Sequence, residues 1–170
     1  MQIPTIGEDQ ASWDEFFIGL CIYWSQKSKD RSTKVGAVIV GEGQNVLATG
    51  FNGFPRGVPD DKEQYHTRPT KYLVTEHAER NAIYNAAREG TRLMGSTMYI
   101  PFEPVPCCDC ARGIIQVGIK KIVGSNIKFT GKGDLWDEHL QVSKDILTDA
   151  GVKCVTVNVN DGLDIRNYHA

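Results

Sequence analysis

The segment TMYIPFEPVPCCDCARGIIQVGIKKIVGS, residues 97–125, decides the fold class of this chain. It begins with a strand-like run, TMYIP, continues with a helix-like stretch, CCDCARGIIQVG, and ends with a second strand-like run, KKIVGS. Pro106 stands directly before the helical stretch, at a position that is typical of a helix start. A strand, a helix and a strand in this order predict parallel neighbouring strands joined by a right-handed crossover.

The neighbouring segments extend this alternation in both directions. Downstream, residues 135–151 predict a helix and residues 152–159 a strand. Upstream, the β-rich runs at residues 35–41 and 45–51 flank the turn EGQ and predict an antiparallel hairpin. We therefore expect the first two strands to pair antiparallel and the later strands to be mainly parallel.

Two further helices are expected upstream of the segment 97–125. The first begins at Ser12, which forms an S-x-x-E capping box with Glu15 and is followed by apolar residues at helical spacing. The second begins near Glu76 in an alanine-rich stretch and ends at Gly90. The resulting order, α-β-β-α-β-α-β-α-β, predicts a five-stranded mixed sheet with helices on both faces.

The stretch between residues 52 and 75 has no sustained period and contains three prolines. We interpret it as a long loop. Loops of this length inside a domain are usually functional lids or disordered segments.

Composition favours one globular domain, over residues 1–170, because 41% of the residues are hydrophobic and the chain is too short for two independent cores. The formal net charge of −2 argues against a protein held on nucleic acid. The acidic N-terminal stretch is unlike a secretory signal, and no apolar run approaches the roughly 20 residues of a membrane span. We therefore expect a cytoplasmic protein whose five cysteines stay reduced.

Three cysteines lie within four residues in PCCDC, and helical spacing separates them. Cys107 and Cys110 share a helix face and can hold one ion, whereas Cys108 points away from that face. Zinc usually takes four ligands, so further ligands are needed. The candidates are His66, His77, His139, His169, Cys21 and Cys154. His77 is favoured because it stands at an expected helix start and Glu79 follows two residues later.

The combination of H-x-E with P-C-x-x-C is the signature of zinc deaminases, in which the glutamate is not a ligand. Two thiolates and one imidazole leave a coordination position open, where zinc brings the pKa of a water molecule toward roughly 7. Glu79 beside that water could carry protons to a ring nitrogen and to the departing amine. The pattern therefore predicts hydrolytic deamination. The alternative for an isolated C-x-x-C is a structural zinc knuckle or a redox pair.

Three stretches, KVGAVIVGEGQNVLATGFNGFPRGVPDD, HAERNAIYNAAREG and TMYIPFEPVPCCDCARGIIQVGIKKIV, together resemble the deoxycytidylate (dCMP) deaminases of the cytidine deaminase superfamily. The similarity covers about residues 13–157. It implies a three-layer α-β-α fold of the cytidine deaminase type and conversion of dCMP to dUMP and ammonia, which supplies thymidylate synthesis. It also implies one Zn²⁺ per chain on His77, Cys107 and Cys110, with Glu79 as the proton shuttle.

For the substrate, the resemblance implies that Asn52 contacts the nucleoside; as a residue before glycine it also suits a turn. Loop cations could bind the 5′-phosphate. Those favoured are Arg31, Lys34 and Arg56, ahead of Arg68 and Lys71. The stretch IPFEPV is two residues longer than the family spacing, and we expect it to affect recognition of the base.

Members of that family are commonly oligomeric, and some respond to dCTP and dTTP. The resemblance thus implies a homo-oligomer, a hexamer or a dimer, with these nucleotides as effectors. Three other functions stay open. The chain could deaminate a modified dCMP, it could be a tRNA adenosine deaminase, although its charge argues against this, or it could be a non-catalytic protein with a closed structural zinc.

Overall fold

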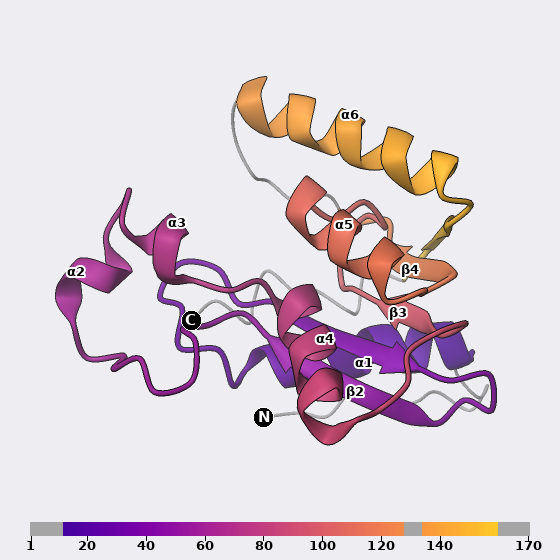
Figure 1. The fold of residues 1–170 in the computed structure, drawn as a ribbon, viewed down its shortest axis with the longest axis horizontal. Coiled ribbons are helices and arrows are strands. Elements are labelled where there is room, and N and C mark those ends of the chain that lie inside the picture. The colour runs from indigo at the N-terminus through magenta and orange to yellow at the C-terminus, as the bar shows by residue number, and fades with distance from the viewer. Residues whose placement is uncertain (1–11, 128–133, 160–170) are drawn as a thin grey trace.

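The computed structural model describes residues 12–127 and 134–159 of the chain (Figure 1). Within these residues, five strands form one mixed sheet in the order β2-β1-β3-β4-β5. Their bounds are β1 Gly36–Val40, β2 Val46–Phe51, β3 Thr97–Tyr99, β4 Lys121–Ser125 and β5 Lys153–Val157. β1 pairs antiparallel with β2 and β3, while β4 runs parallel to both β3 and β5. The predicted five-stranded mixed sheet is confirmed.

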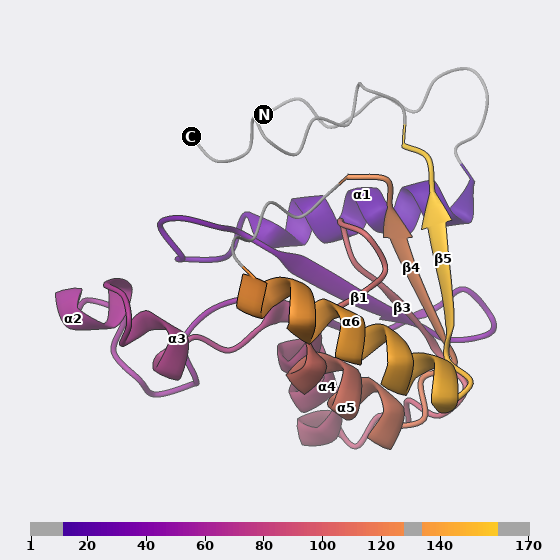
Figure 2. The same ribbon diagram turned by 90° about the horizontal axis from the view of Figure 1, so that it is seen from above.

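Helices cover both faces of the sheet, which confirms the three-layer arrangement (Figure 2). Helix α1, Trp13–Ser25, packs on one face with Phe17, Ile18 and Cys21 buried. Helices α4 (Ala78–Glu89), α5 (Cys108–Gln116) and α6 (Asp134–Asp149) cover the other. Helix α1 begins with the predicted capping box, since Ser12 Oγ accepts from Glu15 N and Ser12 N donates to the Glu15 carboxylate.

The apolar core divides into two clusters, one on each side of the sheet. The cluster beneath α1 includes Phe17, Val38 and Tyr99. The cluster beneath α4, α5 and α6 contains Ala78 and Ala111 from the first turns of α4 and α5. Both helix starts are therefore held by buried apolar contacts on the same side of the sheet, which places their N-termini near each other.

The connection between residues 52 and 75, predicted as a loop that would be a lid or disordered, contains two one-turn helices in the described structure. These are α2, Glu63–His66, and α3, Lys71–Val74. Each has only four residues, too few to show a helical period in the sequence. Lys71 Nζ lies 2.7 Å from the buried carboxylate of Asp30, and this ion pair ties α3 to the chain that follows α1.

The described helices give no candidate for a transmembrane span, because none combines sufficient length with a sufficiently apolar composition.

Candidate active site

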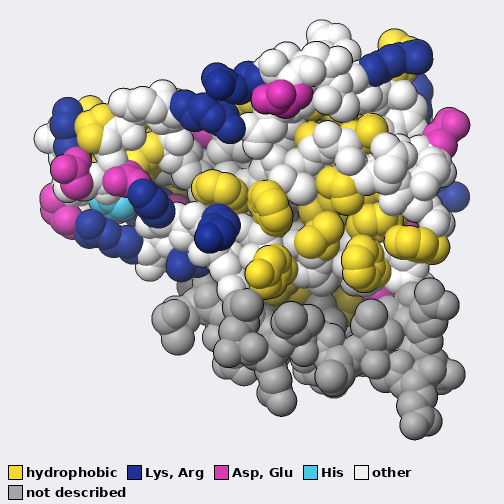
Figure 3. Space-filling model, turned by 90° about the horizontal axis from the view of Figure 1, so that it is seen from below, with side chains coloured by type: hydrophobic (Ala, Val, Ile, Leu, Met, Phe, Trp, Pro, Cys, Tyr) yellow, Lys and Arg dark blue, Asp and Glu magenta, His cyan; other side chains and the backbone are white. Residues whose placement is uncertain are grey.

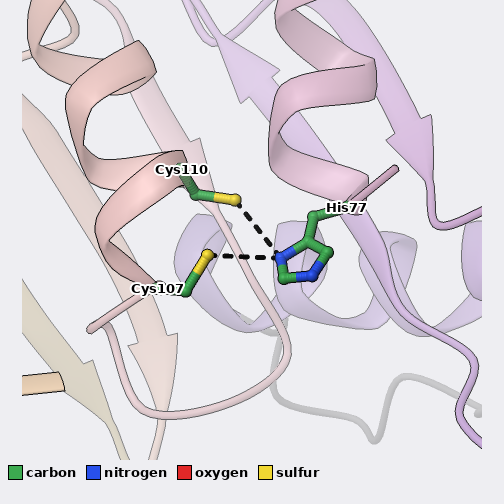
Figure 4. A group of neighbouring side chains, drawn as sticks. All are labelled: His77, Cys107 and Cys110. Atoms are coloured by element: carbon green, nitrogen blue, oxygen red, sulfur yellow. Dashed lines mark hydrogen bonds between the residues drawn. The ribbon is translucent and has the colours of Figure 1, made fainter. Parts of the chain in front are cut away.

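The two halves of the predicted metal motif meet at the N-termini of α4 and α5 (Figure 4). His77 is the N-cap residue of α4 and Cys107 that of α5, both with extended backbone conformations. Cys110 lies one turn into α5. His77 Nδ1 stands 3.3 Å from Cys107 Sγ and 3.5 Å from Cys110 Sγ. The potential ligand atoms of the three residues all lie within 4.8 Å of one another.

This donor set fits a zinc ion. One imidazole nitrogen and two sulfurs are ligands that zinc prefers, and three protein ligands with one open position are typical of catalytic zinc sites. Cys107 and Cys110 are buried, and each approaches from a helix N-terminus, where the helix dipole stabilises a thiolate. Among the described residues, this is the one group of three or more His, Cys, Asp or Glu close enough to share an ion.

The charges within this cluster influence one another. A hydrogen bond from Cys110 is the largest cause that lowers the pKa of Cys107, to about 4. A hydrogen bond with Cys107 raises the pKa of His77 to about 9. The Cys110 thiol, which shares its proton with Cys107, has a raised pKa. The cluster thus provides one thiolate, which is the form of cysteine that binds a metal.

Glu79 lies in the first turn of α4, two residues after His77, and is only 9% exposed. Burial raises the pKa of its carboxyl group, and the nearby positive charge of His77 opposes this effect. A carboxyl group buried beside a candidate metal centre is well placed for proton transfer, because bulk water does not compete for its proton.

Cys108 faces helix α6. Its Sγ lies 2.8 Å from the carbonyl oxygen of His139, to which it donates a hydrogen bond. The structure therefore separates the three cysteines as helical spacing predicted, with Cys107 and Cys110 facing His77 and Cys108 turned elsewhere.

The longer stretch IPFEPV packs onto the end of β4. Ser125 N donates to Phe102 O at 2.8 Å, and Ser125 Oγ donates to Pro101 O at 2.6 Å. A Cβ atom on Gly124 would lie 2.1 Å from Phe102 O, so this crossing requires glycine. The backbone that leads to Pro106 and the two cysteines is thereby held against the sheet.

Arg80, which the sequence reasoning missed, links the two ligand-bearing helices. Its guanidinium pairs with Glu76, four residues earlier, and lies 3.4 Å from the carboxylate of Asp109 in α5. Glu76 also accepts a hydrogen bond from the backbone N–H of His77 at 3.1 Å. The i, i+4 spacing of Glu76 and Arg80 was visible in the sequence, but the contact with Asp109 depends on the packing of α4 against α5.

Asn52 is buried, and its side chain faces the connection before β1. Its Oδ1 accepts from Val35 N at 2.8 Å, and its Nδ2 donates to Thr33 O at 2.8 Å and to Asp30 at 3.3 Å. The amide therefore organises residues 30–35. Contact between Asn52 and a substrate stays a prediction.

The three favoured phosphate-binding cations have different surroundings. Arg31 is exposed and pairs with Glu63 at 2.8 Å. Lys34 is partly exposed in the connection before β1. Arg56 donates to Asn85 Oδ1 at 2.5 Å and lines a pocket of about 300 Å³. Their contact with a phosphate also stays a prediction.

That pocket lies between the end of β2, the connection of residues 52–75 and one side of α4. Its charged lining residues are Lys27, Lys29, Arg56 and Lys71 together with Asp30 and Asp60, and Asp30 pairs with Lys71 while Asp60 pairs with Lys29. Phe54 and His66 contribute aromatic rings whose centres are 5.0 Å apart. The pocket combines an excess of cations over carboxylates with flat rings, features that suit a nucleotide.

The site as a whole defines the class of the protein. A histidine and two cysteines face one another at the starts of two helices, on one side of a mixed sheet. A buried glutamate follows the histidine by two residues, as in the zinc-dependent deaminases.

Comparison with known proteins gives the family. Residues 11–125 match the family described as the cytidine and deoxycytidylate deaminase zinc-binding region, and the chain belongs to this family. It is 35% identical to deoxycytidylate deaminase of Homo sapiens over 127 residues, covering 72% of this chain and 69% of the human protein. A deaminase of Aliivibrio fischeri is 38% identical over 145 residues, covering 84% and 92%.

A solved structure supports the same relationship. The dCMP deaminase of cyanophage S-TIM5, in complex with dCMP and dUMP, superimposes with a TM-score of 0.63 at 27% identity, covering 85% of this chain and 95% of that one. The resemblance inferred from the sequence is confirmed.

Proposed function

We propose that this chain is a dCMP deaminase, an enzyme that hydrolyses dCMP to dUMP and ammonia with one zinc ion per chain. The observation that carries the proposal is the convergence of His77, Cys107 and Cys110 beside the buried carboxyl group of Glu79. Relatives that deaminate dCMP support the substrate assignment. The product dUMP would supply thymidylate synthesis.

His77, Cys107 and Cys110 would hold the metal. Zinc bound there would lower the pKa of a water molecule toward about 7 and so supply the nucleophile. Glu79 would take the proton of that water and deliver it to N3 of the cytosine ring as C4 is attacked. It would then carry the proton of the hydroxyl group now on C4 to the amino group, so that the C–N bond breaks, ammonia leaves and C4 becomes a carbonyl carbon. Burial of Glu79 keeps both transfers away from bulk water.

A release assay for ammonia tests this function. Zinc-loaded protein would be given dCMP, CMP, dCTP, deoxycytidine, a 5-substituted dCMP and an RNA hairpin in separate reactions. Turnover of dCMP in preference to the others is the expected result. If no free nucleotide is converted, the proposal is wrong, and turnover of the hairpin alone would identify an RNA deaminase instead.

We further propose that the cationic pocket beside α4 binds a nucleotide effector such as dCTP or dTTP. The candidate metal ligands and Glu79 lie outside its described lining. Asn81 and Asn85 line the pocket and also donate to the backbone of β2, at Phe51 O and Thr49 O. A ligand there would contact the same helix that presents His77 and Glu79, which offers a route for regulation.

The protein would act as a homo-oligomer in which a second copy covers the outer side of α1. Trp13, Phe16 and Tyr23 of this helix are each about half exposed, at 50%, 46% and 50%. Figure 3 shows hydrophobic side chains gathered on the side formed by α1 and the edge strand β2. Such an interface would be isologous, with the same exposed side chains of α1 contributed by both copies.

A further inference from the structure

Helix α6 crosses behind the turn that carries the cysteines, and two hydrogen bonds join them. Ser143 Oγ, in α6, donates to the carbonyl oxygen of Pro106 at 2.6 Å. In the opposite direction, Cys108 Sγ donates to the carbonyl oxygen of His139 in α6 at 2.8 Å. Ser143 is fully buried and Cys108 is 8% exposed, so water does not compete for either bond.

The two hydrogen bonds run in opposite directions between the same two segments. A serine inside a helix commonly donates to the carbonyl four residues earlier in its own helix. For Ser143 that carbonyl belongs to His139, and here it receives the thiol of Cys108 instead. The hydroxyl of Ser143 is thereby directed to the metal-site turn. Each segment provides one side-chain donor and one backbone acceptor.

The two bonds hold the residues on either side of Cys107, one through the carbonyl group of Pro106 and the other through the side chain of Cys108. The carbonyl of Pro106 belongs to the peptide unit that leads into Cys107, and Cys108 is the residue that follows it. The ring of Pro106 fixes the φ angle of that residue. Because the hydrogen bond also holds its carbonyl group, the peptide unit between Pro106 and Cys107 has little freedom to rotate. The side chain of Cys107 leaves the backbone between these two anchored points, and its Sγ faces His77.

We infer that Ser143 and Cys108 are positioning residues for the metal ligand Cys107, and that α6 is a support of the metal centre. The third cysteine of PCCDC thus has a role that does not involve coordination. The inference rests on the proposed zinc site, because it concerns how firmly Cys107 is held for that ion. Removal of a group that orients a metal ligand commonly lowers metal affinity or activity by about 10–100-fold.

A purely structural role for these bonds makes a different prediction. Helix α6 also packs through Leu147, which is 1% exposed and belongs to the cluster beneath α4, α5 and α6, and through Ile146, which is partly buried against that cluster. These apolar contacts dock the helix without Ser143. If the hydroxyl only adds stability, its loss should lower the melting temperature and leave the metal site unchanged in the folded fraction.

Competition for zinc with a chromophoric chelator separates the two roles, on folded protein and without substrate. The variants are Ser143→Ala, Cys108→Ala and Cys108→Ser, which keeps a donor. The matched control is Ser25→Ala, since Ser25 is also buried and donates to a carbonyl, that of Ile22, on the opposite side of the sheet. Substitution with cobalt would report ligand geometry through its visible absorption.

We expect Ser143→Ala and Cys108→Ala each to weaken zinc binding about tenfold and to change the cobalt spectrum. Cys108→Ser should restore most of the affinity, and Ser25→Ala should match the wild type. Equal zinc affinity in Ser143→Ala and Ser25→Ala would overturn the inference while leaving the proposed function intact. Should Ser143→Ala fail to fold, the comparison of Cys108→Ala with Cys108→Ser decides. A wild-type protein that takes up no zinc would instead overturn the proposed metal centre.

Discussion

Gly50 in β2 lies directly against the first turn of α4, so that a Cβ atom at position 50 would stand 2.3 Å from the carbonyl oxygen of Ala78. Ala78 is the residue between His77 and Glu79. The absence of a side chain at Gly50 therefore lets the sheet approach the helix start that carries the metal ligand and the proposed proton shuttle.

The substitution Gly50→Ala should move the start of α4 away from β2. We expect a loss of about 1–3 kcal/mol in the free energy of unfolding, typical of overpacking, together with weaker zinc binding. Denaturant unfolding and zinc content measure the two effects. Gly19→Ala is the control, because the described structure leaves open space around Gly19 in α1, and alanine there should be neutral or stabilising. Unchanged stability in Gly50→Ala would contradict the close contact.

Replacement of Glu79 by alanine should strongly reduce turnover and retain zinc, since the carboxyl group is proposed to move protons and not to bind the metal. A loss of about 10²–10⁴-fold in kcat is expected for removal of a general acid and base. Steady-state ammonia release and metal analysis check this. Glu89→Ala, at the exposed end of the same helix, serves as the control. A Glu79→Ala enzyme near the wild-type rate would show that the assigned mechanism is wrong.

Measured metal content should distinguish the proposed zinc ligands from Cys108. His77→Ala and Cys110→Ala should lose zinc, because each removes one of only three proposed protein ligands. Cys108→Ala should still bind one zinc per chain when no chelator competes, although we expect its affinity to be reduced. Metal analysis after dialysis measures the stoichiometry. Zinc retained at full stoichiometry by Cys110→Ala would remove that residue from the ligand set.

The parts of this site that could be predicted from the sequence are those with local signals. Ser12 and Glu15 form a capping box within one turn, and His77, Cys107 and Cys110 lie at helix starts that periodicity and Pro106 identify. Helical spacing alone predicted that Cys108 faces away from the side of α5 that carries Cys107 and Cys110. The grouping of His77 with the two cysteines is the exception, because it came from the deaminase signature and not from local spacing.

The parts that could not be predicted depend on tertiary packing. The contact of Arg80 with Asp109 exists because α4 lies beside α5, and the hydrogen bonds of Ser143 and Cys108 exist because α6 crosses the turn. The partners in these contacts lie more than 25 positions apart in the chain, and no sequence pattern indicated that they would meet. The helices α2 and α3 were missed for a different reason, since a four-residue helix is too short to show periodicity.

The role of Arg56 can be resolved by kinetics. If Arg56 holds the 5′-phosphate of dCMP, Arg56→Met should raise KM for dCMP about tenfold or more when no effector is present, through loss of a charge-assisted hydrogen bond. If it belongs to an effector site, that KM should be unchanged and the response to dCTP should be lost. Arg88→Met, on an exposed position of α4, is the control. No change in either quantity would exclude Arg56 from nucleotide binding.

Acid should destabilise the protein partly through Asp30, a buried carboxylate that ties α3 and residues 32–33 together. Burial alone would raise the pKa of Asp30, but hydrogen bonds from Lys71, Ser32 and Thr33 outweigh it and hold that pKa below its ordinary value. The folded protein therefore keeps this carboxylate to lower pH than the unfolded chain does. The resulting stabilisation is fully present above about pH 4, the ordinary pKa of aspartate, and is lost as the pH falls through the lowered pKa of the folded state.

Asp30→Asn should accordingly lower the free energy of unfolding at neutral pH by about 2 kcal/mol, the scale of hydrogen bonds to a charged group, and flatten its decline in acid. Urea unfolding between pH 3 and pH 7 measures both. Asp145→Asn, exposed on α6, is the matched control and should retain the wild-type profile. Because Asp30 also receives the amide of Asn52, the variant should loosen residues 30–35, which hydrogen exchange would detect. A variant whose acid profile parallels the wild type would show that the Asp30 carboxylate does not carry this pH dependence.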